Sequence, residues 1–182
     1  MNKKTKKVII ILGLIFLLVF LICFLTKDSE VEFVEYTPGE EISQEQSRQT
    51  MVKLYFKNKE TGELATETRL IDVKNLANNP YEVLVKMLID GPENEKLERL
   101  IPEGTKINKV DFERNVVVID FFEGFIKNHQ GGLEEESKTV YSIVNTLTEL
   151  TEVDGVKILI NGEEGKEFLD EAINFKDAFV RK

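Results

Sequence analysis

The chain has 182 residues, with 24 basic residues, 33 acidic residues and a net charge of −9. Five of the basic and none of the acidic residues lie in residues 1–27, which leaves 19 basic against 33 acidic residues, a charge of −14, on the remainder. That remainder is long enough for one hydrophobic core. Its charge argues against nucleic-acid backbones and anionic lipid headgroups as partners, because like charges repel.

An apolar segment near the N-terminus is typical of a membrane anchor. The 18 residues from 8 to 25 are all apolar or Gly, and they follow Lys3, Lys4, Lys6 and Lys7. A helix of that length spans about 27 Å, close to the roughly 30 Å of a bilayer's hydrocarbon core. Since lysines favour the cytoplasmic side, we predict a cytoplasmic segment 1–7, a transmembrane signal anchor 8–26 and an extracytoplasmic remainder. The predicted location is the cell membrane, with a single pass.

Two other kinds of leader fit this segment less well. A cleavable signal peptide ends in a small-x-small site, whereas residues 20–25 read FLICFL. A lipoprotein needs a small residue before the acylated cysteine, and Ile22 precedes Cys23. Cys23 is the only cysteine, so the extracytoplasmic part has no disulfide framework. A signal anchor is favoured, and lipidation of Cys23 stays an open alternative.

The rest of the chain divides into a stalk and one domain. Residues 27–50 are rich in Glu, Gln, Ser and Thr, which predicts a flexible stalk. Alternation of Val52, Leu54 and Phe56 with polar residues predicts a first strand. A turn at 60–62 leads to a second strand at 66–73. We therefore place the structured domain at residues 51–182.

A helix and a hairpin come next. Asn79 and Pro80 predict a helix start, with a cap followed by proline at the first helical position. The apolar stripe of this helix is Val83, Leu84, Met87 and Leu88, and Gly91-Pro92 ends it. A strand through Ile107, Val110 and Phe112 and a tight turn at 113–115 lead into the Val/Ile-rich strand 116–121, which predicts a hairpin.

The last third of the chain predicts a second helix, a strand and a packed tail. The helix follows Gly131-Gly132 and carries the stripe Val140, Ile143, Val144, Leu147 and Leu150. A strand at 156–160 precedes an apolar tail at 168–180. We expect Gly104 and Gly155 at turns with positive φ, and Thr146 and Thr148 on the exposed side of the helix. The order β-β-α-β-β-α-β predicts an α+β domain with two helices packed on one face of a mixed sheet.

Few residues of the domain suit catalysis. His129 is the one histidine, and the chain has no G-x-S-x-G nucleophile elbow. Asp120 and Glu123 are the best placed carboxylates for glycosidic cleavage, but they equally suit a strand-end turn, with Asp120 bracing the turn that leads to Phe125. The sequence therefore predicts that the protein is not an enzyme, with no catalytic residues.

Metal and cofactor sites are not indicated either. One histidine cannot supply a zinc site, and no calcium loop or phosphate-binding glycine motif occurs. The acidic run 134–136 is expected to be solvated charge at a helix start, where it suits the helix dipole. We predict no cofactor and nominate no metal-binding or cofactor-binding residues.

Several segments, taken in order, resemble the GerM domain of bacterial sporulation and spore germination proteins. They are residues 91–92 (GP), 100–105 (LIPEGT), 117–121 (VVIDF), 143–149 (IVNTLTE), 156–162 (VKILING), 173–175 (INF) and 179–181 (FVR). The resemblance covers about residues 52–181. It implies an α+β fold similar to the ring-building motifs of secretion-type assemblies, and a non-enzymatic role in the envelope of a spore-forming or related bacterium. The chain has one copy of the domain, where the founding type has two.

Three hypotheses follow. The leading one is a membrane-anchored scaffold or assembly module in sporulation or germination, with envelope proteins or like domains as partners in a homo- or hetero-oligomer. The alternative is a module that binds peptidoglycan or an accessory wall polymer. The third, an enzyme, would have to use His129, Asp120 or Glu123.

Overall fold

The computed structural model describes residues 48–168 and 173–181, together with individual positions among the first 20 residues. The chain forms two units, Met1–Ser43 and Gln44–Lys182, and the second contains the folded domain. The predicted anchor 8–26 and stalk 27–50 lie largely outside the described residues, as does Leu169 of the tail. Within the described part of the chain, no helix has the length and apolar character that a membrane span needs.

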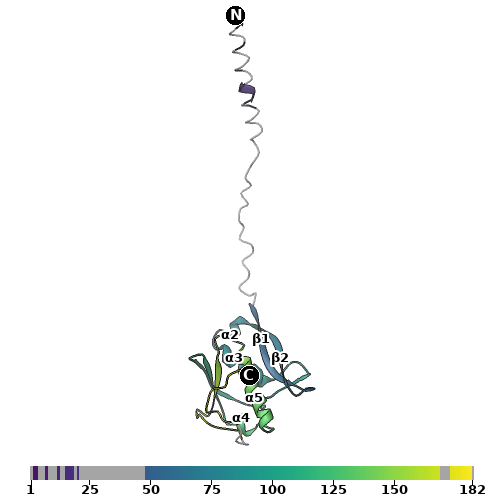
Figure 1. Ribbon diagram of the computed structural model, residues 1–182, viewed down its shortest axis with the longest axis vertical. Helices are drawn as coiled ribbons and strands as arrows, with labels where there is room; N and C mark the ends of the chain where they lie inside the picture. The colour runs from purple at the N-terminus through teal and green to yellow at the C-terminus, as the bar shows by residue number, and fades with distance from the viewer. Residues whose placement is uncertain are drawn as a thin grey trace. The chain divides into compact units, whose positions relative to one another are not determined.

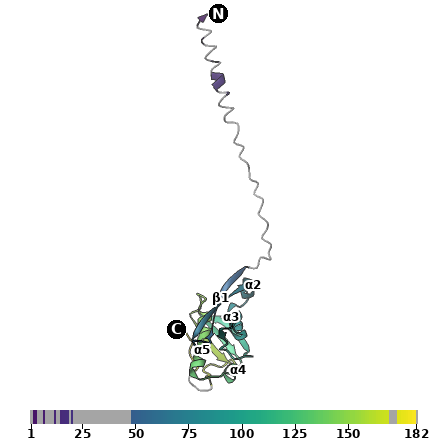
Figure 2. The same cartoon turned by 90° about the vertical axis from the view of Figure 1, so that its right-hand side faces the viewer.

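Within the described residues the strands form two sheets of three. Figures 1 and 2 show β1, the central strand of the first sheet, from two sides. The first has the order β2-β1-β3 and is antiparallel, with β1 (Gln49–Asn58), β2 (Leu64–Asp72) and β3 (Leu97–Glu98). The second has the order β4-β5-β6, in which β4 (Ile107–Glu113) is antiparallel and β6 (Gly155–Ile160) parallel to β5 (Val116–Phe121). The predicted single mixed sheet is therefore wrong, and only the second sheet is mixed.

The helices explain why the strands do not merge into one sheet. They are α2 (Val73–Leu76), α3 (Pro80–Asp90), α4 (Gly124–Lys127) and α5 (Leu133–Leu147). α3 contacts β1 and β4, and α5 contacts β1 and β6, so both long helices touch both sheets (Figure 1) instead of covering one face of one sheet. α5 also occupies the edge of β1, where the N–H of Tyr55 donates to Thr146 Oγ1 at 3.1 Å instead of to another strand.

Local signals place the turns and helix ends where the sequence predicts them. The Asn79 side chain accepts from the N–H of Glu82 at 3.1 Å and so caps α3, and Gly91, with φ 91°, ends this helix. Arg114 and Asn115 have φ of 50° and 64°, the two left-handed residues that a tight hairpin turn between twisted strands requires. The predicted hairpin of β4 and β5 is confirmed, and β1 begins at Gln49, two residues before the predicted domain start.

The described part of the tail packs on the core, as predicted. The Phe125 ring stacks on Phe121 with centroids 4.3 Å apart, and the rings of Phe168 and Phe175 lie 5.6 and 6.2 Å from it. All four side chains are buried. Such ring contacts contribute roughly 0.5–1.5 kcal/mol each beyond the burial of apolar area. The tail therefore completes the core of the second sheet.

The two glycines expected at positive φ differ. Gly104 has φ 75°, which confirms the expectation, whereas Gly155 is not among the residues with positive φ. A Cβ on Gly155 would lie 2.8 Å from the carbonyl oxygen of Phe179, which is hydrogen-bonded to Val156. Gly155 is needed because the tail approaches β6 closely, and the predicted reason was wrong.

Two polar residues of α5 are buried against expectation. Thr146 has no exposed surface, and Glu136 is 2% exposed, although the acidic run was expected to be solvated. Thr148 is half-buried. The reason is the position of α5: a helix that touches two sheets buries more of its circumference than a helix on one face of one sheet.

Candidate functional site

An open groove lies beside the N-terminal half of α5. Its volume is about 970 Å³, and its walls come from the end of β1, from the segment 90–103 and from the loop 128–131. Basic and acidic side chains both line it. The basic ones are Lys57, Lys59 and Arg99, and the acidic ones are Asp90, Glu98, Glu103 and Glu135. Charges of both signs in one groove suit a ligand or protein surface that is itself mixed in charge.

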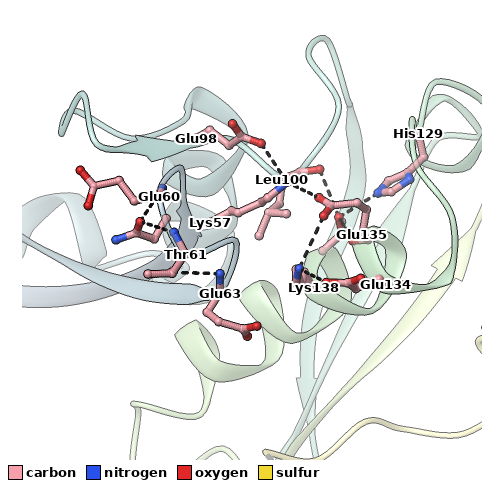
Figure 3. Close-up of polar contacts among 12 residues, drawn as sticks. Lys57, Glu60, Thr61, Glu63, Glu98, Leu100, His129, Glu134, Glu135 and Lys138 are labelled. Carbon is pink, nitrogen blue, oxygen red and sulfur yellow. Dashed lines mark hydrogen bonds and ion pairs between the residues drawn. The ribbon is translucent and has the colours of Figure 1, made fainter.

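Lys57 is the centre of the polar contacts beside this groove (Figure 3). Its Nζ lies 2.9 Å from Glu135 of α5 and 3.2 Å from Glu98 of β3. The hydrogen bond to Glu135 raises the pKa of Lys57, and Glu98 adds to the shift while partial burial opposes it. Lys57 therefore stays charged and joins three elements of the domain.

Lys138 makes a second link on the same helix. Its Nζ lies 2.5 Å from Glu134 and 3.6 Å from Glu135, as Figure 3 shows. The hydrogen bond to Glu134 raises the pKa of Lys138 and lowers the pKa of that glutamate. Two members of the acidic run at the start of α5 are thus ion-paired, and the third, Glu136, is buried.

His129 connects the loop before α5 to the helix and to the tail. Its Nε2 lies 2.8 Å from Thr139 Oγ1, and its ring centroid lies 4.8 Å from that of Phe168. Thr139 is fully buried and lies within hydrogen-bond distance of the carbonyl oxygens of Leu100 and Glu135, at 3.2 and 2.9 Å. These contacts position the segment 100–103 and the loop 128–131, which form two of the walls of the groove.

Asp120 and Glu123 each contact other residues of the domain. Asp120 is 7% exposed, and its two oxygens accept from the N–H of Gly162 at 2.8 Å and from the amide of Asn108. Asp120 therefore braces β4 and the turn after β6, which corrects the expected role in the turn leading to Phe125. Glu123 is exposed and pairs with Lys127 at 2.7 Å.

A buried ion pair on β2 was missed in the sequence. Glu67 pairs with Arg69 and accepts from the N–H groups of Glu93 and Asn94 at 3.0 and 2.8 Å, while Arg69 donates to the Gly91 carbonyl at 2.6 Å. Burial alone would raise the pKa of Glu67, but the Asn94 N–H and the Arg69 guanidinium outweigh it and hold that pKa below its usual value. Opposite charges two residues apart on a strand were the available signal.

A second missed cluster holds the C-terminal segment. Glu149 accepts from Tyr55 Oη at 2.8 Å, lies 3.1 Å from Lys53 Nζ and pairs with Arg181. The hydrogen bond from Arg181 is the largest cause that lowers the pKa of Glu149 to about 2. The cluster joins β1, the residues after α5 and the tail.

No group of three or more possible metal ligands occurs among the described residues. The charged clusters around Lys57, Glu67 and Glu149 each connect elements that are distant in sequence. The fold and these clusters together define a small α+β domain that presents surfaces and a groove of mixed charge.

Comparison with known families places this domain in one of them. Residues 53–166 match the model of the Germane family, whose description is "Sporulation and spore germination". That match covers more than half of the chain, so the chain belongs to this family, and the resemblance seen in the sequence is confirmed.

Curated and solved relatives agree with the family. Over 140 residues the chain is 31% identical to the spore germination protein GerM of Bacillus subtilis (strain 168), a match that covers 75% of this chain and 37% of that protein. The chain thus spans little more than a third of the length of that relative.

Solved structures show the same fold. The tandem GerMN domains of the sporulation protein GerM from Bacillus subtilis align with a TM-score of 0.62 and 27% identity, over 73% of this chain and 46% of that one. The first GerMN domain alone aligns with a TM-score of 0.61 and 27% identity, over 72% of this chain and 98% of that domain. A putative lipoprotein from Clostridium perfringens, 20% identical with a TM-score of 0.51, shares the fold.

Proposed function

We propose that this chain is a membrane-anchored, non-enzymatic envelope protein that acts as a scaffold or assembly module in sporulation or spore germination. Membership of the Germane family supports the process. The apolar run 8–25 behind four lysines supports the anchor. The extracytoplasmic domain would then meet envelope proteins or like domains through its surfaces.

The observation that carries this proposal is that the chain aligns with nearly the whole of one GerMN domain. The match spans 98% of the first GerMN domain of GerM, so the folded part of this chain corresponds to one such domain and not to a fragment of it. The polar side chains of the described domain also link its own elements, as Lys57, Asp120 and Glu149 do. An assembly role needs a folded domain with accessible surfaces, and these contacts help to fix the positions of its elements.

Co-purification tests the assembly role. The tagged full chain is extracted with detergent from membranes of sporulating cells, alongside a Phe125→Ala variant that keeps the apolar leader and loses the central ring of the core. We expect the native chain to recover envelope proteins that the variant does not. Recovery of the tagged chain alone, or of the same proteins with both chains, would contradict the proposal.

Protease accessibility tests the anchor. A protease added outside intact protoplasts should remove the domain and leave a short N-terminal fragment in the membrane. A domain that is protected until the protoplasts are lysed, or a chain free in the medium, would contradict the proposed topology.

The groove favours one alternative, a wall-binding module. Peptidoglycan and accessory polymers carry both anionic and cationic groups, and the groove presents Arg99, Glu98 and Glu103 together. Retention on purified wall that Arg99→Ala weakens, and that Lys86→Ala on the exposed surface of α3 leaves unchanged, would favour this alternative. Equal retention of both variants, or none, would remove the groove as a wall site.

A further inference from the structure

The strand β2 is a long, regular edge strand. It has nine residues, lies at the end of the order β2-β1-β3 and pairs with β1 without a register shift. Natural edge strands are commonly guarded against pairing with other chains by charged side chains, proline, a bulge or a covering segment. β2 reads LATETRLID, with neither lysine nor proline, and its two inward-facing charges, Glu67 and Arg69, are paired with each other.

The edges of the second sheet are guarded. In β4 the register shifts between Ile107 and Lys109, and the Asn79 side chain donates to the Val110 carbonyl at 2.9 Å. On the far side of β6, Val156 and Phe179 exchange two backbone hydrogen bonds of 2.8 Å, so the tail covers that edge. The contrast marks the edge of β2 as a surface suited to another strand.

The hydrogen-bond pattern shows which groups of β2 point outward. The N–H of Asn58 donates to Glu63 and the N–H of Val73 donates to Arg48, both at 2.8 Å, at the two ends of the β1–β2 pair. Because bonded and non-bonded pairs alternate in an antiparallel ladder, the odd-numbered residues of β2 bond to β1. The even-numbered residues, Thr66, Thr68 and Leu70 among them, direct their N–H and C=O groups away from β1.

These outward groups select one self-complementary register. If Thr68 lies on a two-fold axis, Thr66 faces Leu70 of a second copy, and Glu67 faces Arg69 of that copy. Moving the pairing to the next bonded registers would set Glu67 against Glu67 or Arg69 against Arg69. Opposite charges across strands stabilise a pair and like charges destabilise it. Glu67 and Arg69 already pair within one chain, so the two copies would place four charges of alternating sign around the axis.

The solvent face of the same sheet offers apolar contacts in this register. Met51 and Leu70 are opposite each other on β1 and β2 and are 71% and 65% exposed. Leu70 would lie beside Thr66 of the second copy, whose own neighbour on β1 is Tyr55. Each exposed Met51–Leu70 pair would thus gain a row of neighbours from the other chain.

We propose that β2 pairs antiparallel with β2 of a second copy of this chain, with Thr68 on the two-fold axis, so that the two first sheets form one sheet of six strands. This inference rests on the proposed assembly role and identifies one partner in it. The association is isologous, as in most homodimers, because the same surface contributes from both copies.

Cysteine cross-linking of the full chain in detergent tests the register. A Cys23→Ser background removes the one native thiol. In the proposed dimer, Thr68→Cys places two thiols in a bonded antiparallel pair, with Cα atoms about 5.5 Å apart, within disulfide range. Thr66→Cys is the matched control, because the two copies of residue 66 would lie four positions, about 14 Å, apart along the strands. Maleimide labelling of every variant confirms that each thiol is exposed.

Under mild oxidation we expect Thr68→Cys to give a band at twice the mass of the chain on a non-reducing gel. Thr66→Cys alone and Leu70→Cys alone should give almost no dimer band. A mixture of these two variants should give the dimer band, because residue 66 of one copy faces residue 70 of the other. Absence of the Thr68→Cys band, or an equal band from Thr66→Cys alone, would overturn the proposal.

A charge exchange provides a second test without oxidation. Thr68→Lys and Thr68→Glu each set like charges on the axis, so each variant alone should sediment as a monomer. An equal mixture should form the dimer, because the opposite charges then meet. Dimers of either variant alone, or monomers in the mixture where the native chain is dimeric, would contradict the register.

These outcomes separate this inference from the proposed function. Failure to cross-link at residue 68, with envelope proteins still recovered, overturns only the β2 pairing. Specific cross-linking at residue 68, with no envelope protein recovered, supports the pairing and counts against a wider assembly.

Discussion

Removal of the Glu67 carboxylate should destabilise the domain strongly. Glu67 and Arg69 side chains are 9% and 10% exposed. Glu67→Ala would leave the N–H groups of Glu93 and Asn94 without their acceptor and Arg69 without its counter-charge. Loss of the partner of a buried charge costs about 3–5 kcal/mol. Arg69 would still donate to the Gly91 carbonyl at 2.6 Å. We therefore expect Glu67→Ala to lower the free energy of unfolding by about 3 kcal/mol, the low end of this range.

Glu67→Gln should lower the free energy of unfolding by about half as much, because the amide oxygen still accepts hydrogen bonds and only the charge is lost. The measurement is urea unfolding at pH 7, followed by far-UV circular dichroism because the chain has no tryptophan. Glu93→Gln is the control: its side chain is 78% exposed and lies 3.6 Å from Arg69, so its effect should stay below about 0.5 kcal/mol.

The effect of Glu67→Ala should also depend on pH. The folded-state pKa of Glu67 is lowered, so its stabilisation is fully present above the unfolded pKa of about 4.3 and disappears as the pH falls through the folded value. The difference between the native chain and the variant should therefore shrink below about pH 4. A variant within 0.5 kcal/mol of the native chain at pH 7, or a difference that grows in acid, would refute this account of the β2 cluster.

Three further changes test other parts of the domain. Phe125→Ala removes the central ring of the core and should cost about 4 kcal/mol in urea unfolding. Gly155→Ala sets a methyl group 2.8 Å from the Phe179 carbonyl, and we expect about 2 kcal/mol of destabilisation and faster proteolysis of the tail. Arg181→Ala removes the main cause of the lowered Glu149 pKa, which is about 2. That pKa should then rise toward 4.5 in an NMR titration, with less than about 1 kcal/mol of stability lost because the pair is near the surface. An unshifted Glu149 pKa would show that Arg181 does not hold it.

The groove was the part of the candidate site that sequence patterns could not reveal. Its walls come from segments near residues 57, 100 and 130, and no periodicity relates them. His129 was recognised only as a lone histidine, and its contact with Thr139 depends on how the loop returns to α5. The Glu149 cluster was invisible for the same reason, because it joins segments that the fold brings together. Of the Glu67 cluster, only the spacing of Glu67 and Arg69 could be seen in the sequence, and its contacts with Glu93 and Asn94 depend on the fold.

Interactions between residues close in sequence made the elements predictable. The Asn79-Pro80 start of α3, the left-handed pair Arg114 and Asn115 and the strands β5 and β6 all appear where local patterns indicated, because caps, turns and periodic burial act within a few residues. Tertiary contacts decided the rest. The bond from Tyr55 to Thr146 joins residues 91 positions apart, and it marks the edge at which α5, and not a fourth strand, closes the first sheet. That placement splits the strands into two sheets and buries Thr146 and Glu136, since burial depends on what surrounds a helix as well as on its own sequence.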